Sequence, residues 1–300
     1  MKTPAVTPSP KIGLCLSSGG ARGLAHVGVI EVLEHAGVPI SAISGSSMGA
    51  YVGSLLALGL KAADLRQLAA EIRDRKTLLR LLDPIFPPSK GLIKGQKMRH
   101  HLERTLGTAT FEELPIPLAV VAADLDTLRA HVFRKGNVAA AVHASAAIPG
   151  VFAPVALNGR MFTDGGAADP MPVSLLKETM GVDKVIAVDV VTDATYTSSS
   201  CLGWLNLLGA GNVLDTFHRS LITAQRQLVI KEAELADIVI RPAMTKSRWY
   251  DFENFNHYIE AGRAAAKAAL PSILELLETE NPDHRHETVI QQTRMGFLAA

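Results

Sequence analysis

Cysteine is scarce in this 300-residue sequence, which contains only Cys15 and Cys201. Both lie in apolar surroundings, and they do not form the spacing of a metal site or a redox pair. The sequence therefore argues against a disulfide framework, and both thiols are predicted to be reduced core residues, as in cytosolic proteins. Aromatic residues are also few, at 5%, but 48% of the residues are hydrophobic, which suffices for a large globular core.

Neither sign of charge is in excess, because 30 lysine and arginine residues stand against 29 aspartate and glutamate residues. The net charge therefore gives no reason to expect a nucleic-acid partner. Long hydrophobic runs are missing too, since the longest are interrupted by proline or are too short to span a bilayer. The opening MKTPAVTPSPK has three prolines and no apolar signal region, so we expect a soluble, unsecreted chain.

What the sequence does contain is an alternation of strand and helix patterns. Residues 12–17 (IGLCLS) and 40–44 (ISAIS) are typical of buried strands, and residues 23–37 between them of a helix closed by glycine. An apolar helix pattern follows over residues 47–60. Further strands are expected at 117–124, 151–157, 184–191 and 236–242. This alternation predicts a three-layer α/β/α fold with a largely parallel central sheet.

A single domain is expected, because the chain shows no internal repeat and no linker long or polar enough to separate two domains. We assign residues 12–280 to this domain, residues 1–11 to a flexible N-terminal segment and residues 281–300 to a C-terminal tail. Residues 61–110 and 194–235 interrupt the alternation and are interpreted as additions around the core sheet.

The stretch GSSMG at residues 45–49 matches the pattern G-x-S-x-G and falls between a predicted strand and a predicted helix. A turn this tight holds Ser47 in a strained conformation, and Gly45 and Gly49 leave room for neighbouring backbone. The hydroxyl would lie at the helix N-terminus, where partial positive charge stabilises a nearby anion. This context favours a nucleophilic serine over the alternative, a glycine-rich helix start with Ser46 or Ser47 as N-cap.

A second glycine-rich turn, SGGARG at residues 18–23, follows the first strand and opens the first helix. The backbone N–H groups of Gly19, Gly20 and Ala21 are candidates for binding an oxyanion, and Arg22 could brace the loop. The competing interpretation is a dinucleotide-binding turn. Ser18 replaces the first glycine of that fingerprint and no acidic residue ends the second strand, so the oxyanion interpretation is favoured.

The base that would activate Ser47 is harder to assign from pattern alone. In the α/β-hydrolases it is a histidine late in the chain. His218 and His257 fall within helical patterns, and His284 and His286 fall in the polar tail, so all four are interpreted as surface or packing residues. Asp164 ends a short apolar stretch and is followed by two glycines, which by itself is a common turn sequence.

Taken together, these segments resemble the patatin-like phospholipases, particularly their small bacterial members. The resemblance covers nearly the whole chain in order, through GGARGLAHVGVIEVL, GSSMGA, AADLDT, HASAAIPGVFAPV, DGGAADPMPV, ADIVIRP and DFENFNHYIEAGRAAAKAAL. It implies a patatin-like fold in which Ser47 is the nucleophile and Asp164 its base, in a dyad without histidine. It further implies an oxyanion loop of Gly19, Gly20, Ala21, Arg22 and Gly23, with Gly165 and Gly166 completing an Asp-Gly-Gly motif, and no cofactor or metal.

Three positions depart from the family pattern. Ser17 and Ser18 stand where relatives often carry glycine, and Leu128 follows Thr127 where many relatives have glycine. The serines could alter the approach to the oxyanion hole. His143 belongs to a segment that runs close to the site in relatives, but a packing role is favoured for it over contact with the dyad.

The predicted activity is hydrolysis of lipid acyl esters, phospholipid or lysophospholipid, in the cytoplasm or peripherally at the inner membrane. Nucleic acid is not an expected partner, whereas transient contact with a membrane surface is compatible with the resemblance. The apolar residues 201–214 are interpreted either as an acyl-chain wall that dips into a membrane interface or as a buried core helix. Two alternatives stay open, namely a non-lipolytic carboxylesterase with a Ser-Asp-His triad and a regulatory or adaptor protein.

Overall fold

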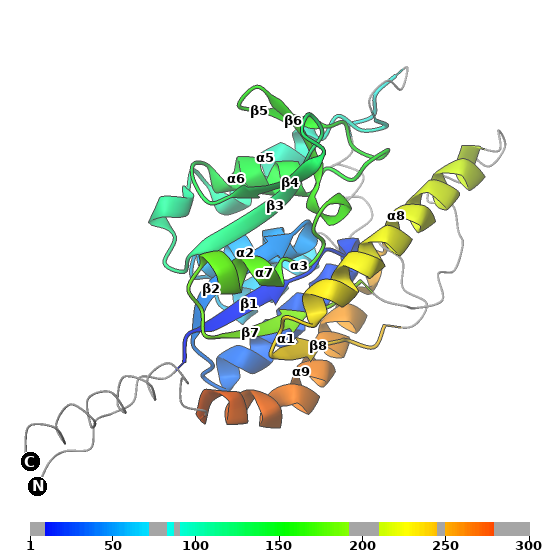
Figure 1. Ribbon diagram of the computed structural model, residues 1–300. Helices are drawn as coiled ribbons and strands as arrows, with labels where there is room; N and C mark the ends of the chain where they lie inside the picture. Colours follow the sequence, from blue (N-terminus) through cyan, green and yellow to red (C-terminus); the bar gives the residue numbers. More distant parts are fainter. Residues whose placement is uncertain (1–9, 72–82, 87–90, 192–209, 245–249, 279–300) are drawn as a thin grey trace, which may run out of the picture.

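A computed structural model describes residues 10–71, 83–86, 91–191, 210–244 and 250–278, with no side-chain description for residues 210–215. One eight-stranded sheet organises the chain, in the order β5-β6-β3-β2-β1-β7-β8, with β4 pairing β3 (Figure 1). Its parallel strands are β1 (Ile12–Leu16), β2 (Ile40–Ser46), β3 (Leu118–Asp124), β7 (Lys184–Val188) and β8 (Ile238–Ile240). The antiparallel additions are β4 (Arg129–Phe133), β5 (Val155–Leu157) and β6 (Arg160–Asp164).

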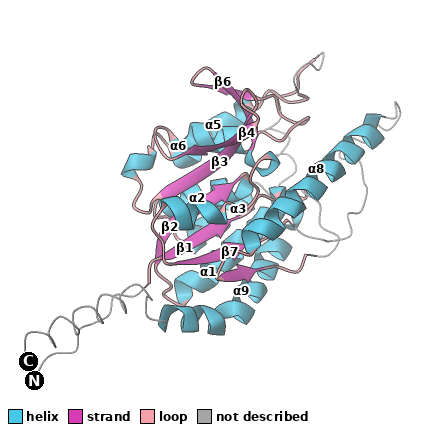
Figure 2. Cartoon of the chain, viewed as in Figure 1, coloured by secondary structure: helices cyan, strands magenta, loops and turns pink. Residues whose placement is uncertain are grey.

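Helices flank the sheet on both sides (Figure 2). The α-helices are α1 (Ala25–His35), α2 (Met48–Ala57), α3 (Ala62–Glu71), α5 (Gln96–Leu106), α6 (Val138–Ser145), α7 (Val173–Thr179), α8 (Ala210–Ala233) and α9 (Phe255–Glu278). Short 3-10 turns, η1 (Gly20–Leu24), η2 (Phe111–Glu113), η3 (Gly165–Ala167) and η5 (Phe252–Asn254), join some of them. The structure therefore confirms the predicted fold class.

The side chains of β1 point alternately to the two faces of the sheet, and each face has its own hydrophobic core. Ile12, Leu14 and Leu16 point into a large core shared with α1, α2 and α9, whereas Cys15 points into a smaller core with Leu176 of α7. All four side chains are fully buried, as expected for a central parallel strand covered on both faces. The prediction of a buried, unpaired Cys15 is confirmed, and Cys201 lies outside the described residues.

Helices α1 and α9 pack against each other on the larger core, and two glycines let them approach closely. A Cβ on Gly28 would lie 1.9 Å from the carbonyl oxygen of Ile259, and one on Gly262 would lie 1.9 Å from that of Ala25. Contacts this short forbid any side chain at either position. Because α9 is late in the chain, this contact anchors the C-terminal part of the described fold to its first helix.

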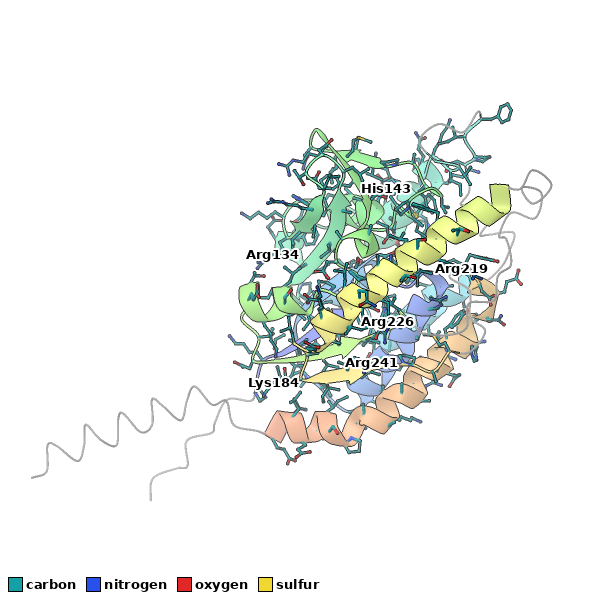
Figure 3. All side chains as sticks on the ribbon, turned by 45° about the vertical axis from the view of Figure 1, so that its right-hand side comes forward. Arg134, His143, Lys184, Arg219, Arg226 and Arg241 are labelled. Atoms are coloured by element: carbon teal, nitrogen blue, oxygen red, sulfur yellow. The ribbon has the colours of Figure 1, made fainter. Side chains whose placement is uncertain are left out.

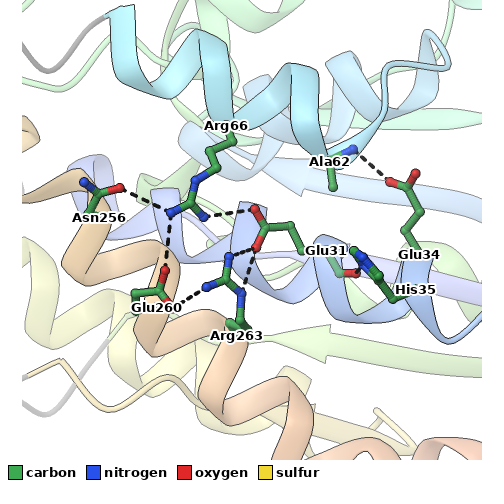
Figure 4. Close-up of polar contacts among 8 residues, drawn as sticks. All are labelled: Glu31, Glu34, His35, Ala62, Arg66, Asn256, Glu260 and Arg263. Atoms are coloured by element: carbon green, nitrogen blue, oxygen red, sulfur yellow. Dashed lines mark hydrogen bonds and ion pairs between the residues drawn. The ribbon is translucent and has the colours of Figure 1, made fainter.

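An ion-pair network reinforces that corner of the molecule (Figure 4). Glu31 of α1 is largely buried and binds Arg263 of α9 and Arg66 of α3, the latter at 3.1 Å. Arg66 and Arg263 also contact the more exposed Glu260. The two arginines neutralise a carboxylate that burial alone would destabilise. The network joins three helices and lies on the α1–α9 side of the sheet.

The predicted elements agree with the observed ones except at two places. The strand expected over residues 151–157 is confined to Val155–Leu157, because Val151 and Phe152 donate their amides to the carbonyl of Ile148 in a turn. Strands β4 and β6 were not predicted individually. Apolar and polar residues alternate only weakly along β4, and most of its residues are partly or fully exposed. Its sequence therefore lacks the hydrophobic pattern of a buried strand.

Candidate active site

The β2–α2 junction presents Ser47 in a strained backbone conformation. Its φ of 54° and ψ of −121° lie in a region that residues with a side chain rarely adopt. Ser47 occupies the N-cap position of α2, but its side chain makes no capping hydrogen bond. The hydroxyl of Ser46 is buried without a partner among the described residues. Neither serine therefore acts as a helix cap, and the Ser47 hydroxyl is left for another partner.

Glycine is required on both sides of this turn. A Cβ on Gly45 would lie 2.7 Å from the backbone of Gly49, and one on Gly49 would lie 2.1 Å from the carbonyl oxygen of Leu16. The turn thus packs directly on itself and on the end of β1. Steric exclusion by backbone atoms, which cannot move aside as a side chain can, accounts for the two glycines of the pattern.

Asp164 meets Ser47 through the sheet register. Ser46 pairs with Val121 on one side of β3, and Ala122 pairs with Asp164 on the other side. The Ser47 hydroxyl donates to Asp164 Oδ2 at 2.6 Å, although the residues are 117 positions apart in sequence. Both side chains are 5% exposed. The structure thus brings together the predicted nucleophile and the predicted base.

Ser145, at the end of α6, positions the serine backbone. Its hydroxyl accepts from the Ser47 amide at 2.8 Å and donates to the carbonyl of Val121. This residue links the strained turn to β3. It lies within the HASAAIPG segment but was not predicted as a site residue, because a serine in an alanine-rich helix gives no signal of its role before the helix is placed.

Burial sets the protonation chemistry of Asp164. Loss of solvent raises the pKa of its carboxyl to about 6, while the hydrogen bonds from Ser47 and from the Gly166 amide lower it. The Gly166 amide reaches Oδ1 at 2.8 Å. An ordinary aspartate is a weak base for a hydroxyl, so a raised pKa makes this carboxylate a better proton acceptor near neutral pH.

The predicted oxyanion loop lies beside Ser47 and Asp164, but only part of it faces their pocket. Gly19, Gly20 and Arg22 line the same pocket as Ser47 and Asp164, whereas Ala21 and Gly23 are buried and do not line it. Gly20 has a φ of 57° and begins the 3-10 turn η1. The first amides of such a turn have no acceptor within it, and no backbone acceptor from the described residues reaches those of Gly19 and Gly20.

The remaining glycines of the predicted site serve close packing. A Cβ on Gly23 would lie 2.3 Å from Met48 Cγ, so this glycine lets η1 approach the start of α2. One on Gly165 would lie 2.1 Å from the carbonyl oxygen of Val121, so this glycine holds the turn after Asp164 against β3. Both residues support the site through backbone placement.

A pocket that is partly open to solvent lies over Ser47 and Asp164. Helix α8, along which Figure 3 labels Arg219 and Arg226, forms one wall. Apolar side chains supply much of the lining, namely Ile148, Pro149, Val191, Leu221 and Ile222. Ser47, Asp164 and the glycine-rich loop therefore share a pocket with a mainly apolar lining, which is suited to an ester with an apolar chain.

A family model described as Patatin-like phospholipase matches residues 14–177, more than half of the chain. The chain belongs to this family. The match includes the loop after β1, the β2–α2 turn and the Asp-Gly-Gly segment, so all the predicted site residues fall inside it.

Relatives of this patatin-like protein include an uncharacterized NTE family protein of Mycobacterium tuberculosis, 41% identical over 182 residues that cover 61% of this chain and 49% of that protein. Lysophospholipase NTE1 of Candida albicans is 31% identical over 191 residues, covering 63% of this chain and 14% of that protein. The crystal structure of VipD from Legionella pneumophila has the same fold, with a TM-score of 0.52, 17% identity and coverage of 91% and 69% of the two chains. The chain spans about half the length, or less, of these curated relatives.

The departures from the family pattern have separate structural roles. The Ser17 hydroxyl accepts from the Val190 amide at 2.9 Å and so ties the start of the predicted oxyanion loop to the segment just after β7. Ser18 lines the pocket. Leu128 has a φ of 58° in the exposed β3–β4 turn, a conformation that favours glycine, and is not among the pocket residues.

The histidines are placed differently from one another. His218 on α8 lines the pocket, but the Ser47–Asp164 hydrogen bond is direct and includes no histidine. His143, labelled in Figure 3, is largely buried and hydrogen-bonds the Gly95 backbone, and burial lowers its pKa. His257 is exposed, and the tail histidines lie outside the described residues. His143 therefore has the packing role that was favoured for it.

The described residues contain neither a membrane-spanning helix nor a metal-binding cluster. No helix among them is long and apolar enough to cross a bilayer. No cluster of three or more histidine, cysteine, aspartate or glutamate side chains in that part of the chain could hold a metal ion. Most of the apolar segment 201–214, interpreted either as an acyl-chain wall or as a core helix, lies outside the described residues.

Proposed function

We propose that this protein is a serine hydrolase of lipid acyl esters, phospholipid or lysophospholipid, which works through a Ser47–Asp164 dyad. The observation that carries the proposal is the 2.6 Å hydrogen bond from a strained serine at the N-terminus of α2 to a buried carboxylate. Membership of the patatin-like phospholipase family supports it, as does similarity to a protein named lysophospholipase.

Acylation begins when Ser47 Oγ attacks the ester carbonyl carbon and its proton passes to Asp164. The carbonyl oxygen becomes negative and is stabilised by the amides of Gly19 and Gly20, together with the positive end of α2. Collapse of this intermediate expels the lysolipid or glycerol oxygen, which takes the proton from Asp164. An acyl-enzyme ester on Ser47 remains.

Substrate class follows from the pocket lining. The apolar side chains of α8 and of the segment after α6 provide a surface on which an acyl chain loses contact with water, and each buried methylene contributes about 0.8 kcal/mol. Longer chains should therefore bind more tightly until the wall is covered. The pocket opens to solvent, so a polar head group can stay hydrated.

Fatty-acid release from lysophosphatidylcholine, and from phosphatidylcholine in mixed micelles, tests the proposal directly. The wild-type chain should hydrolyse at least one of them, and Ser47→Ala should lose roughly three or more orders of magnitude in kcat while remaining folded. Ser47→Ala should also abolish labelling by a fluorophosphonate probe. A short-chain p-nitrophenyl ester cleaved faster than long-chain ones would favour a non-lipolytic esterase, and an unlabelled wild-type protein would favour the adaptor role.

The pH dependence of kcat/KM should reflect the raised pKa of Asp164. Because the carboxylate form is the base, kcat/KM should rise with pH and level off above a midpoint near the pKa of about 6. Below that midpoint it should fall about tenfold per pH unit as the carboxyl is protonated. A midpoint near 4 would contradict the role of burial. Thermal denaturation over the same pH range would separate loss of base from loss of fold.

A further inference from the structure

An exposed leucine occupies a strained position in the β3–β4 turn. Leu128 has a φ of 58°, which glycine adopts freely and leucine does not, and it is 84% exposed. Single exposed leucines are common on protein surfaces, but this one also carries a backbone cost. A side chain that costs conformational free energy and is left in water indicates a partner that covers it.

The turn that carries Leu128 lies at the edge of the sheet where the pocket is found. Ser46 pairs with Val121, and the parallel strand β3 continues to Asp124 before the turn begins. The turn therefore lies beyond Ser47 along the strand direction, by roughly 10 Å. The pocket is lined by the loops that follow β1, β2 and β7, so it lies at this same carboxyl edge.

Phe86 is a second exposed apolar residue close to the pocket, and it is 97% exposed. Its segment pairs through Pro84 with Ile93, and Ile93 pairs in turn with Phe152. Phe152 belongs to the segment after α6, in which Pro149 lines the pocket. A large aromatic side chain thus projects into water beside the segment that forms one side of the pocket.

Helix α8 supplies a third exposed apolar residue. Phe217 is 49% exposed and lies directly before His218 and one turn before Leu221, both of which line the pocket. The N-terminal end of α8 projects beyond the sheet (Figure 1). Three segments that are distant in sequence therefore each place a large apolar residue at the pocket edge of the sheet. We call Phe86, Leu128 and Phe217 the rim residues.

The polar groups of the β3–β4 turn suit a phospholipid surface. Asp126 accepts from a backbone amide of β6 at 2.9 Å, and Asp124 pairs with Arg160, so both carboxylates are engaged within the protein. Arg129 is exposed next to Leu128. An apolar side chain that enters hydrocarbon, with a cation beside it at the level of the lipid phosphates, is typical of interfacial anchors.

A bilayer fits the rim residues better than a protein partner does. The neighbours of Leu128 in its turn include the exposed polar residues Asp126 and Thr127, so the turn presents an isolated apolar point and not a continuous face. Protein interfaces have a closely packed core, whereas fluid hydrocarbon surrounds each inserted side chain separately. The mainly apolar lining of the nearby pocket suits an acyl chain from the same bilayer.

We propose that the rim residues insert into the surface of a phospholipid bilayer and hold the pocket against it. In that position an acyl chain passes from the bilayer into the pocket without crossing water. The inference rests on the proposed function for the class of lipid, but insertion itself requires no catalytic step. Binding and hydrolysis are therefore measured separately.

Flotation of the full-length chain with phosphatidylcholine vesicles tests the inference. The binding measurements use the Ser47→Ala protein as parent, because it does not consume the lipid while they are made. Leu128→Gly, Phe86→Ser and Phe217→Ser are added to it one at a time, and the bound fraction is measured against lipid concentration. Leu128→Gly removes the side chain and relieves the positive φ in one change.

Two apolar residues away from the pocket edge provide matched controls. Ile230 and Leu274 are exposed to about the same extent as Phe217. Ile230 lies near the other end of α8, and Leu274 lies on α9. Ile230→Ser and Leu274→Ser should keep vesicle binding within about twofold of the parent protein, because neither side chain belongs to the rim.

Each rim substitution should lower the vesicle partition constant roughly fivefold or more, because burial of a leucine or phenylalanine side chain favours partition by about tenfold or more. Leu128→Gly should leave the thermal midpoint unchanged or raise it, since glycine relieves the strained φ. With Ser47 intact, the rim variants should hydrolyse phosphatidylcholine vesicles more slowly in proportion to the lost binding. Their hydrolysis of soluble p-nitrophenyl butyrate should stay within about twofold of wild type.

Three results would overturn the inference. They are a parent protein that does not float with the vesicles, binding within twofold of the parent in any two of the rim variants, and an equal loss of binding in the two controls. Self-association that Leu128→Gly abolishes, without vesicle binding, would assign the rim to contact between copies of the chain. Failure of the proposed function is a distinct result, in which vesicles bind through the rim but neither lipid nor p-nitrophenyl butyrate is hydrolysed.

Discussion

Asp164→Asn should lower kcat by roughly two to four orders of magnitude on a soluble ester. The amide has the shape of the carboxylate and can still accept from the Gly166 amide, but it cannot take the proton of Ser47. The remaining activity should lose the pH dependence with a midpoint near 6, because the titrating group is gone. Steady-state kinetics from pH 5 to pH 8 would measure both effects.

The Asp164→Asn variant should be at least as stable as the wild-type protein, although its activity falls. Burial raises the pKa of Asp164 above its unfolded value, so above pH 6 the ionised carboxyl disfavours the folded state. Asparagine removes that charge, and the weaker hydrogen bond to Ser47 offsets part of the gain. At pH 8 we therefore expect a thermal midpoint no lower than that of the wild-type protein.

Histidine variants provide the matched comparison for the base. His218→Ala removes the histidine that lines the pocket, and His257→Ala removes an exposed one on α9. Each should keep kcat within about tenfold of wild type, because neither imidazole belongs to the Ser47–Asp164 hydrogen bond. A loss with His218→Ala as large as that with Asp164→Asn would contradict the dyad and favour the Ser-Asp-His triad.

Gly20→Val should lower kcat by roughly a hundredfold or more, with a smaller change in KM where KM approximates substrate binding. Gly20 has a φ of 57°, which a β-branched residue resists, so valine should turn the loop away from the dyad. In the proposed mechanism, the loop amides would stabilise the oxyanion in the transition state more than they bind the neutral ester. Kinetics on a short-chain ester, with circular dichroism as a check of folding, would measure the effect.

Gly37→Val is the control for backbone strain. Gly37 closes α1 with a φ of 68°, is exposed, and has nothing within 4 Å of the position that a Cβ would take. Its valine variant therefore carries a similar conformational cost at a site remote from the pocket, and its kcat should match wild type. If folded Gly20→Val also kept its kcat, the oxyanion donors would have to be sought outside residues 18–23.

The local sequence was enough to predict the turn that carries Ser47, because the close backbone contacts of that turn involve only nearby residues. The pattern around Ser47 predicted a tight strand-to-helix turn, because glycines are needed where backbone passes over backbone, and the contacts of Gly45 and Gly49 agree with that reason. Helix α1 was predicted to end at Gly37 for a similarly local reason, and that glycine has the positive φ of a helix end.

The pairing of Ser47 with Asp164 could not be worked out from local pattern. A carboxylate followed by two glycines is an ordinary turn sequence, and only resemblance to a family suggested it as the base. The sheet decides the contact, since β3 pairs with β2 on one side and with β6 on the other. The same holds for Ser145, whose helix must be placed before its hydroxyl has a function.

By itself, then, the sequence determined the fold class and the serine turn, because hydrophobic period and glycine sterics act over a few residues. Only the tertiary structure decided which loop residues reach the pocket: Gly19 and Gly20 line it, whereas Ala21 is buried beneath. It also brought Ser18 and Gln225, more than 200 positions apart, to the lining of the same pocket. Burial, which depends on every layer of the fold, likewise set the pKa of Asp164.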